Sequence, residues 1–159
     1  MKPAFDFNRA LVEKYDRPGP RYTSYPTAPQ FHQAFAVDDY QTAARASNQL
    51  AVPKPLSVYI HIPFCKSLCY YCACNKIITQ KTHRAVEYLK YLKREIAMQA
   101  ALFDGSRKLT QLHLGGGTPT YLTSEQLADL MDCLHQAFNL DDSDDHEFSI
   151  EVDPRTTRE

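Results

Sequence analysis

Three short segments of alternating aliphatic and polar residues are separated by two longer amphipathic segments in this chain. Strict alternation predicts β-strands, whereas apolar residues that recur every three to four positions predict α-helices. The predicted strands are 56–62, 108–114 and 147–152, and the predicted helices are 82–102 and 123–138. Strands joined by helices of this length pair in parallel through right-handed crossovers. We therefore expect an α/β fold with a parallel sheet.

Each predicted strand has an aliphatic face and a polar face, because successive side chains of a strand point to opposite sides of the sheet. In the first strand Val58 and Ile60 share one face, and Tyr59 and His61 share the other. We expect the helices to cover the aliphatic face and the polar face to form the wall of a ligand cavity. Parallel folds place their sites at the carboxyl ends of the strands. Here those ends carry a cysteine loop, a glycine triplet and Glu151.

The N-terminal region has a different composition. Residues 1 to about 30 are rich in proline, tyrosine and arginine and show no sustained period, so we expect an extended arm. A short helix is predicted from Val37 to about Leu50. We divide the chain into an arm with a short helix, 1–55, and a parallel α/β region, 56–159. A complete eight-stranded barrel takes about 250 residues, so we expect the chain to be the N-terminal part of a longer protein.

The charge balance and hydropathy of the chain exclude several classes of function. The chain has 18 Lys and Arg, 19 Asp and Glu, and a formal net charge of -1. Nucleic-acid binding depends on a surplus of positive charge that releases counterions, so we expect no nucleic-acid partner. No segment approaches the roughly 20 apolar residues that span a bilayer, and the first residues lack the apolar core of a secretory signal. We expect a cytoplasmic protein without a membrane span.

Most of the cysteines are clustered in one loop after the first strand, at Cys65, Cys69, Cys72 and Cys74. Clustered thiols in a reducing compartment indicate metal or redox chemistry rather than disulfides. The spacing of the first three gives one thiolate to each of three irons of a 4Fe-4S cluster and leaves the fourth iron open to a substrate or cofactor. One alternative is a zinc site with Cys74 as the fourth ligand, although structural zinc sites usually pair two separated knuckles. Another is a ferredoxin-type carrier, although its cysteine run usually ends in Cys-Pro.

The glycine triplet and the last cysteine have simpler interpretations as well. Gly115, Gly116 and Gly117 follow the second strand, where missing side chains let the backbone approach a ligand and expose N–H groups to it. The triplet also fits a tight turn helped by Pro119, and its place at the end of a strand favours the ligand site. Cys133 lies inside the second predicted helix, and we expect it to belong to the core.

The sequence CKSLCYYC, residues 65–72, resembles the signature loop of the radical S-adenosylmethionine (SAM) superfamily. The resemblance implies that Cys65, Cys69 and Cys72 bind a 4Fe-4S cluster and that SAM chelates the fourth iron through its amino and carboxylate groups. Reductive cleavage of SAM then gives methionine and a 5'-deoxyadenosyl radical that removes hydrogen from an unactivated carbon. The implied fold is an incomplete (β/α)6 barrel with the cluster at its open top. This chain would form the N-terminal portion of that barrel, preceded by the extended arm.

The resemblance also assigns contacts with SAM. The implied residues are Tyr59, Tyr71, Gly116, Gly117, Thr118 and Glu151. The stretch 116–118 matches the segment that contacts the methionine amino group, and Glu151 matches a glutamate that contacts the cofactor. Tyr71 matches an aromatic position beside the adenosyl moiety, and Tyr59 matches a tyrosine close to the cofactor. The alternatives are an exposed strand-end acid for Glu151 and a partly buried barrel residue for Tyr59.

Further stretches resemble one family within the superfamily, the oxygen-independent coproporphyrinogen III oxidases. They are GPRYTSYPTA at 19–28, YIHIPFC at 59–65, CNKI at 74–77, LGGGTPTYL at 114–122 and EVDP at 151–154. A related haem-chaperone branch shares some of these motifs but typically lacks the 19–28 stretch and Cys74. A non-catalytic protein that binds a 4Fe-4S cluster and haem is therefore the alternative function.

The family resemblance implies oxidative decarboxylation of two propionates of coproporphyrinogen III to vinyl groups, which gives protoporphyrinogen IX without oxygen in porphyrin and haem biosynthesis. The reaction needs an electron donor and an electron acceptor that the sequence does not identify. Because the substrate carries carboxylates, Arg21 is a candidate anchor. We expect the full-length protein to be a monomer and the N-terminal part alone to be inactive.

Overall fold

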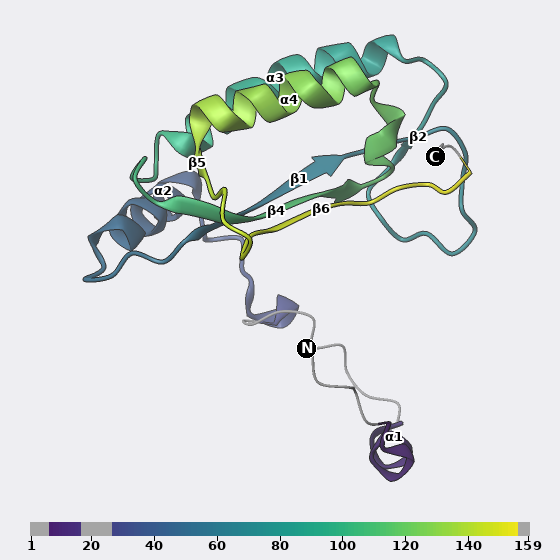
Figure 1. The fold of residues 1–159 in the computed structure, drawn as a ribbon, viewed down its shortest axis with the longest axis horizontal. Helices are drawn as coiled ribbons and strands as arrows, with labels where there is room; N and C mark the ends of the chain where they lie inside the picture. Colours follow the sequence, from purple (N-terminus) through teal and green to yellow (C-terminus); the bar gives the residue numbers. More distant parts are fainter. Residues whose placement is uncertain (1–6, 17–26, 156–159) are drawn as a thin grey trace. The chain divides into compact units, whose positions relative to one another are not determined.

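The structure of the chain is a computed structural model that describes residues 7–16 and 27–155 (Figure 1). The chain divides into two compact units, Met1–Val37 and Asp38–Glu159, each of which is described by itself. Most of the stretch 19–28, including Arg21, lies outside the described residues. The extended course of that stretch and the anchoring role of Arg21 therefore stay predictions.

The first unit contains the short helix α1 (Arg9–Tyr15) and one turn of 3-10 helix at Ala28–Gln30. The prediction of an extended arm was therefore wrong for residues 9–15. The side chain of Asn8 caps α1 by accepting a hydrogen bond from the backbone N–H of Leu11 at 3.0 Å. Arg9 and Glu13 pair one turn apart at 2.7 Å. The prolines of the stretch from which the extended course was inferred, Pro18, Pro20, Pro26 and Pro29, follow this helix and do not interrupt it.

The second unit is built on a parallel sheet of β1 (Leu56–Ile62), β4 (Lys108–Gly116), β5 (Asn139–Leu140) and β6 (Glu147–Ile150). Strand β4 is central, because β1 pairs with it along one side and β5 and β6 pair with it along the other. All of these pairs are parallel. The predicted α/β fold with a parallel sheet is confirmed.

Two helices, α3 (His83–Ala100) and α4 (Ser124–Ala137), cover the same face of this sheet (Figure 1). Helix α4 starts with a capping box, in which Thr123 and Gln126 satisfy each other's backbone N–H groups. The core lies between the helices and the sheet and includes Ile60, Ile62, Leu89, Leu92, Ile96, Leu109, Leu112, Leu114, Leu130 and Leu134. Cys133 is partly buried and packs against this core. None of the described helices combines the length and apolarity needed to cross a membrane.

Two details of the predicted core differ in the structure. Val86, an apolar residue of the predicted helix 82–102, is 60% exposed, and the neighbouring Ala85 is buried. Strand β6 ends at Ile150, two residues earlier than predicted, and Ile150 and Val152 are exposed although their face was expected to lie under the helices. Both differences concern which neighbours cover a side chain, and a local sequence pattern does not contain that information.

The opposite face of the sheet carries the predicted polar side chains. The rings of Tyr59 and His113 stack with their centroids 5.7 Å apart. His113 Nδ1 lies 2.8 Å from Ser149 Oγ on β6, and Gln111 donates to Glu147 at 2.8 Å. Polar contacts therefore run across neighbouring strands on this face, and its role as the wall of a ligand cavity stays a prediction.

A cluster of hydrogen bonds around Arg107 joins the start of the second unit to the turn before β4. The predicted short helix is α2 (Val37–Ala46), which continues into a 3-10 turn at Ser47–Gln49. The guanidinium of Arg107 donates to Ser47 Oγ and Asn48 Oδ1, both at 2.8 Å, and to the carbonyl oxygen of Lys54 at 2.8 and 3.0 Å. One side chain thus fixes the segment between α2 and β1.

Candidate active site at the ends of the strands

The cysteine loop, residues 65–76, follows β1 and is closed at its base by two short parallel strands. These are β2 (Phe64–Cys65) and β3 (Ile77–Ile78). The backbone N–H of Ile77 in β3 donates to the carbonyl oxygen of Pro63, the residue before β2, at 2.7 Å. The base of the loop is therefore fixed to the end of β1.

The four thiols of the cysteine loop differ in exposure and acidity. Cys65 is buried, Cys69 and Cys72 are half-buried, and Cys74 is exposed. A backbone hydrogen bond from Cys74 lowers the pKa of Cys72, and the charge of Lys76 acts in the same direction. The pKa of Cys74 is raised, mainly by its side-chain hydrogen bond with Cys72. A lowered pKa favours the thiolate of Cys72, and the thiolate is the metal-binding form of cysteine.

The cysteine loop and the ends of β4 and β6 line one open pocket of about 690 Å³. These are the three strand ends at which the site was predicted. Of the predicted site residues, the pocket is lined by Cys65, Cys69, Cys72, Tyr71, Gly116, Gly117, Thr118 and Glu151. Parallel pairing of β1, β4 and β6 brings together residues that are far apart in the sequence, because the carboxyl ends of these strands meet at one edge of the sheet.

Close packing between the strand ends requires glycine at two positions. Gly116 has a φ of +112°, which disfavours any residue with a Cβ, and a Cβ there would lie 2.7 Å from the ring of His61. A Cβ on Gly117 would lie 2.8 Å from backbone atoms of Pro63 and Phe64. These two glycines therefore let the end of β4 approach the start of the cysteine loop.

The backbone N–H groups of 116–118 all have partners within the protein. Gly116 donates to Glu151 Oε2 at 3.0 Å, and the next two amides donate to the carbonyl oxygens of Ile62 and Phe64 at 2.8 and 2.9 Å. For Gly116 and Gly117, the expectation that their N–H groups are free to face a ligand was therefore wrong. The acceptors belong to other strands or loops, and the sequence did not indicate which groups they would meet.

Glu151 follows β6 directly and offers acceptor oxygens on the pocket wall. Its Oε2 accepts the hydrogen bond from Gly116, and its Oε1 lies 3.4 Å from His113 Nε2. The side chain remains 52% exposed. A carboxylate has about four acceptor positions, so Glu151 can still accept a hydrogen bond from an amine or hydroxyl group of a ligand.

Two side chains donate hydrogen bonds to cysteine sulfurs from other strand ends. Thr118 Oγ1 donates to Cys65 Sγ at 3.4 Å, and Arg155 Nη2 donates to Cys69 Sγ at 3.5 Å. No role was predicted for Arg155 from the sequence, although its place just after the third strand end, two residues beyond Asp153, was a usable signal. The sequence did not reveal that its side chain reaches the cysteine loop.

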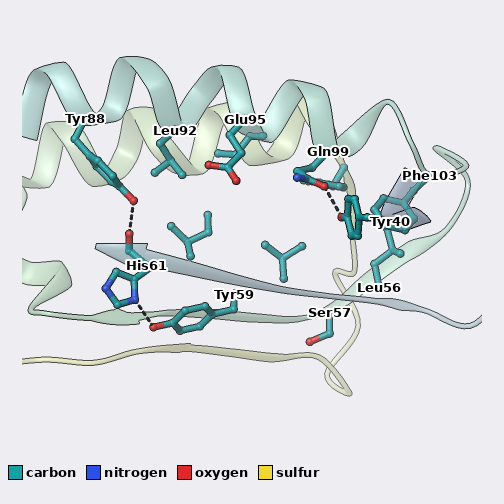
Figure 2. A pocket seen from close by; sticks show the side chains of 14 residues that line it. Tyr40, Leu56, Ser57, Tyr59, His61, Tyr88, Leu92, Glu95, Gln99 and Phe103 are labelled. Carbon is teal, nitrogen blue, oxygen red and sulfur yellow. Dashed lines mark hydrogen bonds between the residues drawn. The ribbon is translucent and has the colours of Figure 1, made fainter. Parts of the chain in front are cut away.

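The two predicted tyrosines lie in different pockets. Tyr71 lines the pocket of the cysteine loop, and its pKa is raised, chiefly by a hydrogen bond with Cys69. Tyr59 lines a second pocket of about 380 Å³ along β1 and α3 (Figure 2). The hydroxyl of Tyr59 lies 2.9 Å from His61 Nδ1, and the other ring nitrogen of His61 lies 2.8 Å from the carbonyl oxygen of Asn75. Tyr59 is thus connected to the cysteine loop without lining its pocket.

The donor set of the cysteine pocket fits an iron-sulfur cluster. Among the residues that the structure describes, no three His, Cys, Asp or Glu side chains come together in a way that would hold one metal ion. Ligands of a single ion converge on one point, whereas the thiolates of a 4Fe-4S cluster bind different irons. Cys65, Cys69 and Cys72 are free thiols that line one pocket, and two of them accept hydrogen bonds through sulfur.

Comparison with known proteins places the chain among relatives of one kind. The Radical SAM superfamily matches residues 59–159. The oxygen-independent coproporphyrinogen III oxidase of Mannheimia haemolytica is 51% identical over 145 residues, which cover 91% of this chain and 94% of that protein. The protein of the same name from Escherichia coli K12 is 50% identical over 151 residues, which cover 94% of this chain and 31% of that protein.

A solved structure supports the same relationship. It is described as coproporphyrinogen III oxidase from Escherichia coli, a radical SAM enzyme, and it matches this chain with a TM-score of 0.75 and 46% sequence identity. The match covers 96% of this chain and 32% of the solved chain. The present chain thus spans about a third of the length of the Escherichia coli proteins that it matches.

Proposed function

The chain belongs to the radical SAM superfamily, among the oxygen-independent coproporphyrinogen III oxidases, and from this premise we propose that it forms the cluster-binding and SAM-binding part of such an oxidase. The observation that carries the proposal is the single pocket in which three cysteine thiols meet the ends of β4 and β6. We further propose that the sheet of the second unit is the first part of an incomplete (β/α)6 barrel. The longer relatives have the length needed for the remaining strand-helix units.

In this proposal the cysteine loop holds the cluster. Cys65, Cys69 and Cys72 each bind one iron of a 4Fe-4S cluster, and the fourth iron stays open for SAM. When bound, the cluster and SAM supply a 5'-deoxyadenosyl radical for hydrogen abstraction. The role of the protein is to fix the three thiols, and the closure of the loop by β2 and β3 supports that role.

The other pocket residues are proposed to hold SAM. Glu151 has an exposed carboxylate that is oriented by the Gly116 N–H, so it is suited to accept hydrogen bonds from the cofactor. The close packing at 116–118 keeps bulky side chains away from the pocket wall. The exposed ring of Tyr71 is available to lie against the adenosyl moiety. Tyr59 is proposed to contribute to the SAM site indirectly, from the polar face of the sheet, through its contact with His61.

The proposed reaction is the oxidative decarboxylation of two propionates of coproporphyrinogen III to vinyl groups, which gives protoporphyrinogen IX without oxygen in haem biosynthesis. The names of the relatives support this substrate. The polar face of β1, β4 and β6 is suited to line the cavity that receives it. One external donor must supply the electron that cleaves SAM, and an external acceptor must take the electron left after carbon dioxide departs. We propose that the protein works in the cytoplasm.

Single replacement of the three predicted ligands tests the site. After anaerobic reconstitution with iron and sulfide, Cys65→Ser, Cys69→Ser and Cys72→Ser should each lose the cluster absorption and most of the bound iron. Cys133→Ser is the matched control, because Cys133 is a free thiol in α4 that does not line the pocket. A normal cluster spectrum and iron content in Cys69→Ser would rule out the ligand assignment.

Turnover is tested in the full-length protein that contains this chain. Reduction of the reconstituted protein in the presence of SAM and coproporphyrinogen III should yield 5'-deoxyadenosine and protoporphyrinogen IX. Binding of haem without formation of either product would instead favour the non-catalytic haem-chaperone function. The two outcomes differ in a measured product, so the assay separates the two hypotheses.

A further inference from the structure

We propose that Arg155 raises the reduction potential of the cluster by donating a charge-assisted hydrogen bond to the sulfur of Cys69, and that Thr118 adds a weaker effect at Cys65. The proposal rests on the proposed function, in which both cysteines are cluster ligands. The contacts themselves are present in the structure, at 3.5 Å for Arg155 Nη2 and 3.4 Å for Thr118 Oγ1.

Asp153 orients the guanidinium of Arg155. Its carboxylate accepts from Arg155 Nη2 at 2.7 Å and from Nε at 2.9 Å, and it also accepts the backbone N–H of Arg155 at 3.0 Å. The hydrogen bond from Arg155 lowers the pKa of Asp153, which keeps the carboxylate ionised. Because a planar guanidinium held on two of its nitrogens has little freedom, the second hydrogen of Nη2 is directed at Cys69.

The second donor is fixed by the backbone. The N–H of Thr118 donates to the carbonyl oxygen of Phe64 at 2.9 Å, and Phe64 is the residue before Cys65. This contact holds the Thr118 hydroxyl beside the Cys65 sulfur. Arg155 and Thr118 follow β6 and β4, so two separate strand ends each supply one donor to a sulfur of the cysteine loop.

Hydrogen bonds to the sulfurs are one of the factors that set the reduction potential of an iron-sulfur cluster. Reduction by a low-potential one-electron donor adds one negative charge to the cluster and changes no covalent bond in the protein. A cationic donor stabilises the reduced form more than the oxidised form. Removal of Arg155 should therefore make reduction less favourable. We expect a fall of about tenfold in the equilibrium constant, which for one electron is about 59 mV.

The experiment is a redox titration of the full-length protein with its reconstituted cluster, using dithionite and mediators under anaerobic conditions. The reduced cluster is followed by electron paramagnetic resonance, and iron is measured in every sample. The variants are Arg155→Gln, which removes the charge, and Arg155→Lys, which keeps the charge without the planar fork. Arg94→Gln is the matched control, because Arg94 is an exposed residue of α3 that does not line the pocket.

The proposal predicts a lower midpoint potential in Arg155→Gln, a smaller decrease in Arg155→Lys and no change in Arg94→Gln. For the second donor, Thr118→Val should lower the potential and Thr118→Ser should restore it. A fully loaded Arg155→Gln with an unchanged potential would overturn the role of Arg155. If Arg155→Gln does not retain its cluster, the test rests on Arg155→Lys. An unchanged midpoint potential in fully loaded Arg155→Lys would then overturn the role of Arg155.

Measurements on the unmodified full-length protein distinguish failure of this proposal from failure of the proposed function. If the unmodified full-length protein binds no cluster, the proposed function fails. If it binds a cluster with the expected spectrum but the Arg155 variants keep its potential, only the tuning role fails.

Discussion

Cys72 and Cys74 show how two thiols in one loop acquire different chemistry. Both line the pocket, yet Cys72 is half-buried and Cys74 is exposed. Lys76 donates to the backbone carbonyl oxygens of both residues, at 3.1 and 3.3 Å, and so fixes the turn between them. The sequence places Cys74 close enough to act as a fourth ligand, and the structure shows that the environments of the two thiols differ.

We predict that Cys74→Ser keeps the cluster. Four protein thiolates would close the fourth iron to the amino and carboxylate groups of SAM, so the proposed function requires Cys74 to stay unligated. The replacement should retain iron at the level of the parent protein and should keep the spectral change that follows addition of SAM, even if turnover falls through altered contacts around the site. Loss of the whole cluster in this variant would contradict the prediction.

Gly117 provides a second prediction at the scale of one residue. In Gly117→Ala the new Cβ would lie 2.8 Å from backbone atoms of Pro63 and Phe64, which cannot move aside as a flexible side chain could. We expect a loss of about 1–3 kcal/mol in the free energy of unfolding, as for other overpacked sites, together with poorer cluster loading. Gly105→Ala is the control, because a Cβ there meets no atom within 4 Å. Equal urea-denaturation midpoints for the two variants would contradict this account.

At the scale of elements, the sequence predicts best those helices and strands that are marked by a local pattern of residues. The alternation in β1 and β4 located both strands and both of their faces, and Thr123 with Gln126 marked the start of α4. Features without a local signal were missed. Strands β2 and β3 have only two residues each, and α1 depends on a cap at Asn8 within a region dominated by later prolines. Elements this short are set by their contacts rather than by a period.

The prediction at the scale of elements concerns the hydrogen bonds of Arg107. Arg107→Ala would remove hydrogen bonds to Ser47, Asn48 and the carbonyl oxygen of Lys54, so that the half-buried Ser47 and Asn48 would each lose one hydrogen bond. We expect a loss of about 1–3 kcal/mol in the free energy of unfolding measured with urea. Arg107→Lys should recover only part of it, because an ammonium group cannot reproduce the planar fork.

The control for Arg107 is a replacement of an exposed arginine in the same unit. Arg94→Ala on the surface of α3 removes the same charge and should change the free energy of unfolding by less than about 0.5 kcal/mol. A similar small effect for Arg107→Ala would show that its hydrogen bonds do not stabilise the fold.

For the whole molecule, topology determined how much of the site could be predicted. Because parallel strands bring their carboxyl ends to one edge, the sequence correctly predicted that the cysteine loop, the glycine stretch and Glu151 would meet. It did not predict that Glu151 would accept a hydrogen bond from the Gly116 N–H, or that Arg155 would donate one to the sulfur of Cys69. These pairings depend on side-chain reach between segments that are distant in the sequence, and no periodic pattern encodes them.

The prediction for the whole molecule concerns its stability toward acid. Hydrogen bonds from the backbone N–H and hydroxyl of Ser106 lower the pKa of Asp104 in the turn before β4. A hydrogen bond from the Ser143 hydroxyl lowers the pKa of Asp141 after β5. A carboxyl whose folded pKa lies below its unfolded value of about 3.9 stabilises the fold above that value, and the contribution is lost as the pH falls through the folded pKa.

The free energy of unfolding, measured with urea from about pH 6 to about pH 3, should therefore decline as the pH falls through about 4. The double variant Asp104→Asn and Asp141→Asn cannot take up these protons and should show a shallower decline. Ser106→Ala removes one donor but keeps the carboxyl of Asp104, so it should reduce the slope by a smaller amount. An unchanged slope in the double variant would mean that the acid sensitivity of the fold arises from other carboxyl groups.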